Sequence, residues 1–255
     1  MKASTVPIRA SLLALTVLAS ISTVHAGGLS PAAITWGSAS AISGDSDIST
    51  SGTFVAAYNF GTTGVSDVTV GGITFTGVAF PTNGSAFVSF GGYSVSSGAS
   101  AFGATNSAAT PGSAPFNTLS SSYQDLLGSF GDATSGSPFN LIFTGLTVGQ
   151  TYAVQIWVND SSNTYSLTTG ASAVNSVSLD GNTTNAVGGL GQFAIGTFTA
   201  SLATQGIIFS TTGGDQIALN AFQIRNVTSV PEPSAFALMA GGVMLGVAVL
   251  RRRLS

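Results

Sequence analysis

Cysteine is absent from this chain of 255 residues, and charged residues make up only 6% of it. Residues 27–229 also contain no histidine, lysine or glutamate. Catalytic triads, thiol chemistry, Schiff bases and metal sites built from His or Cys each need one of these residue types, so this stretch excludes them. No disulfide stabilises the fold, but about 200 residues bury a sizeable core without one.

Basic residues are equally scarce, since residues 27–229 carry eight aspartates and one arginine, a formal net charge of −7. The whole-chain value of −3 hides this, because the other basic residues lie near the two termini. Neutralising phosphates takes clustered Lys and Arg, so nucleic acid is excluded as a partner. Aspartate is the one remaining acid or base, which leaves a hydrolase using two aspartates as the open enzyme class. No aspartate pair stands out, and we expect a protein that is not an enzyme.

The apolar residues of 27–229 recur with the period of β-strands. Residues 151–158 place Tyr152 and Ile156 on one face and Trp157 on the other. Short runs of the same kind predict strands at residues 54–60, 68–80, 87–90, 140–144, 174–179, 193–199, 206–210 and 217–224. Because turns rich in Gly, Asn, Asp and Ser separate them, we predict an all-β fold, a β-sandwich or jelly roll, in one domain.

One short helix is expected, over residues 123–127, because Ser122 is a good N-cap and Gly128 a good stop signal. Its apolar side is expected to cover one end of the sandwich. Residues 91–121 are mainly Ser, Ala and Gly and offer few side chains to bury, so they predict a long loop.

The N-terminal end has the pattern of a secretory signal peptide. Lys2 and Arg9 precede an apolar stretch, and small residues lead up to the Ala26–Gly27 bond. We therefore predict a signal peptide over residues 1–26, exported by the general secretion machinery and cleaved by signal peptidase between Ala26 and Gly27. An uncleaved anchor is the weaker alternative, because the apolar stretch is about half as long as a membrane span.

The C-terminal end combines a short motif, an uncharged apolar run and a basic terminus. Residues 234–250 predict a transmembrane helix, since with Pro233 the run is about 27 Å long against a hydrocarbon core of about 30 Å. Arginines at its end would stay on the cytoplasmic side, which places the preceding residues outside the cytoplasm. The residues that define the two flanks are Val230, Pro231, Glu232 and Pro233 before the run, and Arg251, Arg252 and Arg253 after it.

This arrangement resembles the PEP-CTERM sorting signal of Gram-negative bacteria, whose Pro-Glu-Pro motif, membrane span and Arg-rich end are recognised by the membrane enzyme exosortase. The resemblance implies that residues 230–255 are a sorting signal and that exosortase is a partner. It also implies a precursor held in the inner membrane by its C-terminal helix, and then a location at the cell surface or outside the cell. Whether the tail is cleaved or exchanged for another anchor is left open by the resemblance.

A second resemblance covers roughly the second half of the predicted domain. The segments at residues 145–152, 196–200 and 219–225 look like those of exported PEP-CTERM proteins with a galactose-binding-like jelly roll. Such folds often serve as carbohydrate-binding modules, which implies sugar binding here. No binding residue of that family can be matched in this sequence, and a fold alone carries no ligand site.

Trp157 is the candidate for a sugar-binding aromatic, because it lies opposite the apolar face of its strand and close to Asn159, Asp160 and Asn163. Sugars stack on exposed aromatic rings while amides and carboxylates bind their hydroxyl groups. The alternative, which the pattern favours, is that both faces of the strand are covered and Trp157 is a core residue.

Asp45 and Asp47 are spaced so that they could donate oxygen ligands to one structural Ca²⁺. Neither belongs to a complete calcium-loop pattern, and solvated turn residues are the favoured interpretation. No other cofactor is expected. Arg225, the cation of residues 27–229, is expected to pair with an aspartate.

Together these patterns predict an exported, non-enzymatic protein of the cell surface or extracellular matrix, sorted and processed by exosortase. We expect it to associate with exopolysaccharide, with carbohydrate binding as the more specific form of that role. The alternative is a secreted glycoside hydrolase that depends on aspartate. A glycan array and a turnover assay on a panel of polysaccharides separate the two.

Overall fold

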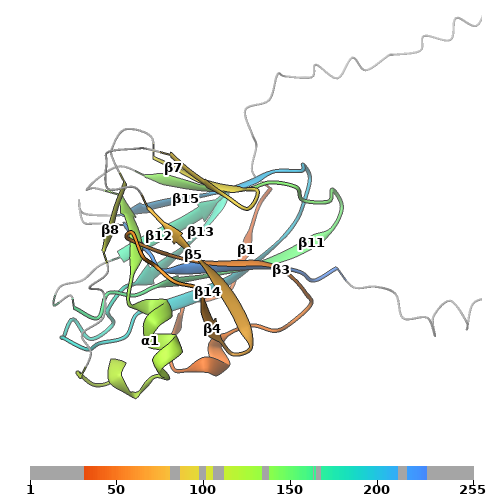
Figure 1. Ribbon diagram of the computed structural model, residues 1–255. Helices are drawn as coiled ribbons and strands as arrows, with labels where there is room; N and C mark the ends of the chain where they lie inside the picture. The colour runs from red at the N-terminus through yellow and green to blue at the C-terminus, as the bar shows by residue number, and fades with distance from the viewer. Residues whose placement is uncertain are drawn as a thin grey trace, which may run out of the picture. The chain divides into compact units, whose positions relative to one another are not determined.

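The computed structural model describes residues 32–80, 87–97, 102–105, 112–133, 138–162, 164, 168–211 and 217–228 (Figure 1). All of these fall within one structural unit. The predicted signal peptide, sorting signal and transmembrane helix lie outside the described residues. Within the described ranges, no helix is both long and apolar enough to cross a membrane.

The larger of two main sheets has the strand order β1-β14-β11-β17-β3-β5-β4, with β2 paired to β14. Neighbouring strands are antiparallel except β3 and β5, which run parallel. We call it the first sheet. Its strands are β1 (Thr35–Trp36), β2 (Ser40–Ala41), β3 (Thr53–Gly61), β4 (Val68–Val70), β5 (Ile73–Ala79), β11 (Thr151–Val158), β14 (Gln192–Thr199) and β17 (Ala221–Asn226).

The second sheet is antiparallel throughout, in the order β13-β12-β15-β10-β7-β6. Its strands are β6 (Phe87–Phe90), β7 (Tyr93–Ser97), β10 (Phe139–Phe143), β12 (Thr168–Ala173), β13 (Asn175–Asp180) and β15 (Gln205–Thr211). A smaller sheet is formed by β8 (Phe102–Thr105), β9 (Phe130–Ala133) and β16 (Ile217–Leu219).

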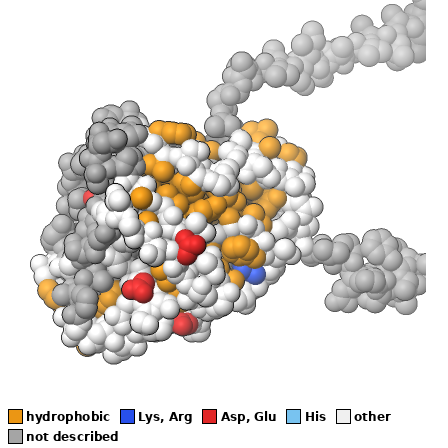
Figure 2. Space-filling model, viewed as in Figure 1, with side chains coloured by type: hydrophobic (Ala, Val, Ile, Leu, Met, Phe, Trp, Pro, Cys, Tyr) orange, Lys and Arg blue, Asp and Glu red, His pale blue; other side chains and the backbone are white. Residues whose placement is uncertain are grey.

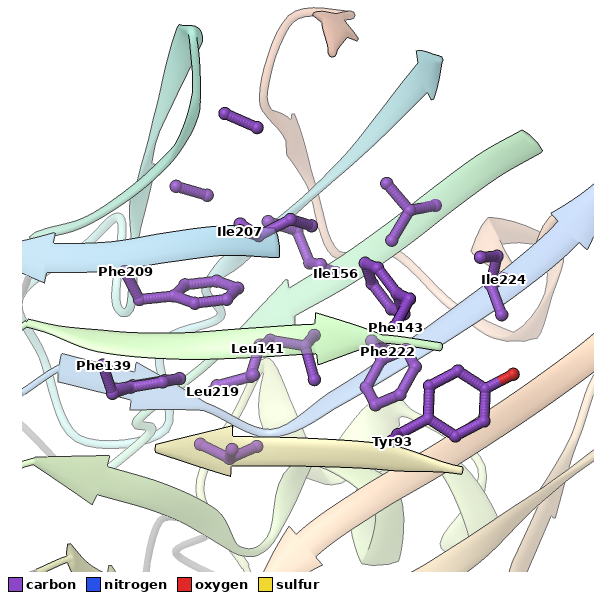
Figure 3. Close-up of a cluster of buried hydrophobic side chains, with 14 of the residues drawn as sticks. Tyr93, Phe139, Leu141, Phe143, Ile156, Ile207, Phe209, Leu219, Phe222 and Ile224 are labelled. Atoms are coloured by element: carbon purple, nitrogen blue, oxygen red, sulfur yellow. The ribbon is translucent and has the colours of Figure 1, made fainter. Parts of the chain in front are cut away.

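The main hydrophobic core lies where side chains of the first and second sheets meet. Figure 3 shows Tyr93 of β7, Phe143 of β10 and Phe222 of β17 side by side, with the Phe143 and Phe222 rings 5.5 Å apart. Because each large apolar side chain removed from water stabilises the fold by about 1.5–3 kcal/mol, this shared core joins the two sheets. The arrangement is a sandwich, which confirms the predicted all-β class.

A second core covers the outer face of the first sheet. Here the helix α1 (Ser121–Leu127) and the 3₁₀ turns η1 (Asp45–Asp47) and η2 (Phe116–Thr118) accompany the apolar side chains that point away from the main core. Figure 1 shows α1 on the side of the first sheet opposite to β7 and β15. Both faces of the first sheet are therefore covered in this region.

Each predicted run contains a strand, and β6 and β11 begin and end at the predicted residues. The runs at residues 68–80 and 217–224 each divide into two strands, β4 and β5 in the first and β16 and β17 in the second. The prediction of a long loop over residues 91–121 was wrong, because β7, β8 and η2 lie within it. The few large side chains of this stretch, Tyr93, Val95 and Phe116, are buried in the two cores and hold it in place. The helix is confirmed, but Ser120 rather than Ser122 is its N-cap, since its hydroxyl accepts a hydrogen bond from the Tyr123 amide at 3.2 Å.

Candidate functional site

A cavity of about 490 Å³ lies between α1 and the turn that leads from β3 to β4. We call it the α1 cavity. Its polar side chains come from both walls, and apolar groups from Val65, Val68 and Phe116 complete the lining. Acidic side chains are visible in the lower part of Figure 2, where Figure 1 shows α1 and β4. The polar lining residues are Asn59, Ser66, Asp67, Gln124, Asp125 and Ser129.

One wall is the turn after β3, which is held close to β5. The Gly77 amide donates a hydrogen bond to Asp67 Oδ1 at 2.9 Å, and Asn59 Nδ2 donates one to the Ser66 carbonyl at 3.2 Å. A Cβ at position 77 would lie 2.7 Å from the Val65 carbonyl oxygen, so this close approach requires glycine. The turn is therefore placed by its own sequence and by β5.

The other wall is the second half of α1 and the residues after it. Leu126 and Leu127 are buried in the second core, which leaves Gln124 and Asp125 to line the cavity. The helix exit is fixed by Asn220, whose Nδ2 donates to the Leu127 and Ser129 carbonyls, both at 2.9 Å. A residue of the first sheet region thus sets where the helix wall ends.

Few donors of the α1 cavity are free. Gln124 Nε2 donates to the Leu119 carbonyl at 2.8 Å, and the Ser129 hydroxyl donates to the Phe60 carbonyl at 2.8 Å. Asn59 is 1% exposed, and its Oδ1 accepts no hydrogen bond from any described residue. This oxygen is itself buried, so the acceptors that a ligand in the cavity can reach are the exposed carboxylates of Asp67 and Asp125, which suit a ligand that brings hydrogen-bond donors.

The structure corrects the idea of a sugar site at Trp157, because this side chain is 0% exposed. It packs in the second core, as the favoured interpretation of its strand predicted, and its Nε1 donates to the Tyr123 hydroxyl at 3.0 Å. Asn159 is also fully buried, and its Oδ1 accepts from the Gly191 amide at 2.9 Å. Asp160 is buried as well and accepts from Ser162, while Asn163 lies outside the described residues.

Asp45 and Asp47 lie together in η1, and other groups of the protein already donate hydrogen bonds to their carboxylate oxygens. Asp47 Oδ2 accepts from the Ser43 amide at 2.7 Å and from the Tyr123 hydroxyl at 3.1 Å, and Asp45 Oδ1 accepts from the Ser120 hydroxyl at 2.6 Å. The described part of the chain brings no three His, Cys, Asp or Glu residues together as metal ligands. Calcium binding at Asp45 and Asp47 stays a prediction.

Arg225 does not pair with an aspartate, contrary to expectation. Its guanidinium donates to the backbone carbonyls of Thr50, Ser51 and Gly52 at 2.8–2.9 Å and lies 5.9 Å from the centre of the Phe54 ring. Figure 2 shows basic atoms beside hydrophobic side chains on this face. Arg225 is 6% exposed, and burial lowers its pKa. It serves to hold the segment before β3 against the first sheet.

Asn59, Gln124 and Asn220 are the polar residues that reasoning from sequence missed. Asn59 and Asn220 interrupt apolar runs that otherwise read as buried strands. An amide in such a place signals a buried hydrogen-bonding role, because an unsatisfied polar group is costly there. That signal could have identified both residues, although not their partners.

One solved structure shows a remote likeness to this chain. It is described as the structural basis for the promiscuous specificity of carbohydrate-binding modules from the β-sandwich superfamily. The likeness has 10% sequence identity and a TM-score of 0.16, and it covers 58% of this chain and 66% of that one, just under two thirds. At this TM-score it carries no argument about fold or ligand.

No curated protein matches the chain in sequence. Residues 229–253 match the PEP-CTERM protein-sorting motif, directly after Thr228, which is the last described residue. The motif indicates an exported protein with exosortase as its processing partner. The chain therefore carries the PEP-CTERM sorting signal that the sequence of its C-terminal end resembles.

Proposed function

We propose that this protein is made as an exported, membrane-held precursor, is processed by exosortase at its C-terminal motif, and acts at the cell surface or outside the cell. The observation that carries the proposal is the PEP-CTERM motif at residues 229–253, which follows residues that are hydrogen-bonded to β11. Val227 donates to the Thr151 carbonyl at 2.8 Å, and the Thr151 amide donates to the Thr228 hydroxyl at 2.7 Å. The motif match starts at the next residue. Processing within it leaves the bonds of β11 and β17 intact.

The N-terminal side of the body supports the same proposal. The Ala32 amide donates to Gln205 Oε1 at 2.8 Å, and Gln205 Nε2 donates to the Ala32 carbonyl at 3.1 Å. These bonds lie beyond the predicted cleavage between Ala26 and Gly27. Removal of residues 1–26 by signal peptidase therefore leaves both of these hydrogen bonds in place.

The body itself acts, in this proposal, as a non-enzymatic structural or adhesive unit in an exopolysaccharide layer, with the α1 cavity as its carbohydrate-binding site. A cavity of about 490 Å³ is within the range of about 300–1,000 Å³ that small-ligand sites occupy. Its polar lining suits hydroxyl groups, and Val65 and Val68 offer apolar contact for a sugar ring. The resemblance of residues 145–152, 196–200 and 219–225 to galactose-binding-like jelly rolls, which often bind carbohydrate, is part of the motivation for this proposal.

Replacement of Glu232 tests the sorting step. Glu232→Ala removes the one acidic residue of the motif, and Ser234→Ala is a matched control just outside the Pro-Glu-Pro residues. We expect Glu232→Ala to accumulate as an unprocessed precursor in the membrane fraction on an immunoblot, and Ser234→Ala to be processed like the wild type. Normal processing of Glu232→Ala would count against recognition through this motif.

An aspartate-dependent glycoside hydrolase is the second candidate, because Asp67 and Asp125 line the same cavity. Two carboxylates are the groups that such an enzyme uses. Both aspartates are exposed, however, whereas the general acid of a glycosidase is typically shielded from water. Turnover of a polysaccharide that Asp67→Asn or Asp125→Asn abolishes would establish the hydrolase in place of the binding protein.

A further inference from the structure

One end of the first sheet is where the described chain leaves the body. Thr228, the last described residue, lies beside the start of β11, because its hydroxyl accepts from the Thr151 amide at 2.7 Å. We call this region the exit end, and it includes the neighbouring turns at residues 144–150 and 200–204. The cross-strand row at the exit end consists of Phe198 on β14, Tyr152 on β11, Asn226 on β17 and Thr53 on β3.

Two turns project from the exit end and are held side by side. The Gly149 amide donates to the Ala200 carbonyl at 2.8 Å, and the Ala200 amide donates to the Gln150 carbonyl at 2.9 Å. Figure 1 shows both turns, in green and light blue, on the side of the body where the described chain ends in blue. Each turn presents an apolar side chain to solvent, since Val148 is 60% exposed and Leu202 is 45% exposed. Turn formation favours Gly, Asn, Asp and Ser, so it does not account for these two aliphatic side chains.

The first residues of β3 add two more apolar groups to the exit end. Phe54 is 44% exposed and Val55 is 41% exposed. The register of β3 and β17 shifts between Ile224 and Arg225, and such a bulge directs side chains away from the regular alternation. Half of the exposed large hydrophobic side chains in the described residues therefore belong to the exit end. Apolar groups that gather in this way mark a contact surface more often than scattered ones do.

The charge of the body is distributed unevenly, and the exit end has no carboxylate. No Asp or Glu occurs in the segments that form it, residues 50–55, 144–154, 197–206 and 224–228. Asp160 follows the opposite end of β11, and Asp180 is the last residue of β13, where its amide donates to Gln192 at the start of β14. Arg225, the sole Lys, Arg or His among the described residues, lies at the exit end, and Figure 2 shows the acidic side chains to the left of the basic atoms. An anionic surface therefore repels the exit end less than the rest of the body.

The chain after Thr228 keeps the exit end close to the membrane in the proposed precursor. Residues 229–233 separate Thr228 from the predicted transmembrane helix at residues 234–250, and fully extended they span at most about 18 Å. β11 has eight residues and is about 26 Å long, so this connection is shorter than the sheet to which it is joined. The exit end is consequently the part of the body nearest to the bilayer.

We propose that the exit end is a membrane-contacting surface, which places Val148, Leu202 and Phe54 in the headgroup region of the bilayer on its non-cytoplasmic side. The inference rests on the proposed membrane-held precursor and adds the surface by which the body meets the lipid. A few apolar side chains bind a bilayer interface weakly and reversibly, but attachment to a membrane span raises their effective concentration there. The contact therefore persists in the precursor, and the body leaves the bilayer once exosortase has processed the motif.

The absence of cysteine from the chain allows one reporter at a time to be introduced. The full-length precursor is reconstituted in liposomes of phosphatidylethanolamine and phosphatidylglycerol, with an environment-sensitive fluorophore attached to Val148→Cys or to Leu202→Cys. Val187→Cys is the matched control, because Val187 is 47% exposed in a turn whose Gly188 amide donates to the Ser161 carbonyl, beyond the opposite end of β11. A nitroxide on the lipid acyl chain is expected to quench positions 148 and 202 at least about fivefold more strongly than position 187.

A second variant separates lipid contact from mere nearness to the membrane. Val148→Asp places a charge on the exit end, and a charge is costly to transfer into the bilayer interface. We expect it to lower lipid quenching at position 202 at least about twofold, whereas Val187→Asp, the control, leaves that quenching unchanged. Both substitutions are at exposed turn positions, so neither disturbs the core.

The remaining outcomes overturn the inference in distinguishable ways. A full-length chain that alkaline carbonate strips from the liposomes would refute the membrane-held precursor and the contact surface together. Membrane retention with equally weak quenching at positions 148, 202 and 187 would refute the contact surface alone. Quenching that Val148→Asp leaves unchanged would mean that the short connection brings the labels near the lipid without contact. A blue-shifted emission at positions 148 and 202 without lipid quenching would mean that a protein, such as a second copy of this chain, covers the exit end.

Discussion

The Trp157 indole on β11 donates a hydrogen bond to the Tyr123 hydroxyl on α1 at 3.0 Å, and that hydroxyl lies 3.1 Å from Asp47 Oδ2 in η1. The three residues link the first sheet, the helix and the 3₁₀ turn that cover its outer face. Trp157 and Tyr123 are both fully buried. The helix that buries Trp157 therefore also forms one wall of the α1 cavity. The same packing rules out the predicted sugar site at Trp157 and shapes the candidate site in the cavity.

Replacement of Tyr123 by Phe is expected to destabilise the protein. The variant leaves Trp157 Nε1 and Asp47 Oδ2 without this partner while keeping the ring in the core, and a lost buried hydrogen bond costs about 1–3 kcal/mol. Urea unfolding followed by tryptophan fluorescence measures the change. Tyr93→Phe is the matched control at neutral pH, because no described residue hydrogen-bonds the Tyr93 hydroxyl. Equal stability of the two variants would contradict the bridging role.

Alkaline pH is expected to destabilise the fold through its buried tyrosines. Burial raises the pKa of Tyr93 to about 12, and burial followed by the charge of Asp47 raises the pKa of Tyr123 further. In the unfolded chain both lose their proton near pH 10. The unfolded chain then binds fewer protons than the folded one, so stability is complete below about pH 10 and falls as pH rises toward 12. Urea midpoints measured between pH 8 and about pH 12 should show this fall, and Tyr93→Phe should reduce it.

Asn220 is expected to be among the most sensitive polar positions. It is 0% exposed, its Nδ2 donates to the carbonyls of Leu127, Ser129 and Asn159, and its Oδ1 accepts from the Asn159 amide at 2.6 Å. Asn220→Ala leaves these groups unsatisfied and should cost about 3 kcal/mol or more.

The control for this variant is Asn175→Ala, since Asn175 is exposed and donates one hydrogen bond, to the Ile34 carbonyl. Its loss should stay near 1 kcal/mol or below, measured by the same urea unfolding. A cost for Asn220→Ala no larger than that of Asn175→Ala would show that the Asn220 network contributes little.

Arg225 should not tolerate lysine. Its guanidinium contacts three carbonyl oxygens at once, from Thr50, Ser51 and Gly52, and a single ammonium cannot reproduce that geometry. We expect Arg225→Lys to lose about 1–3 kcal/mol of stability and Arg225→Met to lose more, by chemical denaturation. A fully stable Arg225→Lys variant would show that charge, not the donor arrangement, is what the position requires.

The strands were predictable because alternation reports which side chains share a face. For β11 the pattern gives both ends and separates Tyr152 from Trp157. Alternation does not report what covers each face, since that depends on α1, whose Tyr123 is 34 positions away from Trp157 in sequence. The short helix was found from its stop signal, while the choice between neighbouring serines as N-cap depended on packing.

The α1 cavity was beyond prediction for a related reason. Asn59 comes from β3 and Gln124 from α1, and nothing in either segment indicates that they lie on opposite walls. The partners of Arg225 could not be predicted for the same reason. They lie 173–175 positions away in the sequence, and they are backbone carbonyls, which no particular residue type identifies. The sorting motif, in contrast, is contiguous, and its residues are recognisable without any tertiary contact.

The central claim, that this is an exported protein processed at both ends, is tested most directly by its intact mass. The protein recovered from the cell surface or medium is compared with the same protein from a strain without exosortase. We predict loss of residues 1–26 in both strains, and loss of the segment after the Pro-Glu-Pro residues only where exosortase is present. A C-terminal segment retained in both strains would contradict the claim and identify a permanently anchored membrane protein.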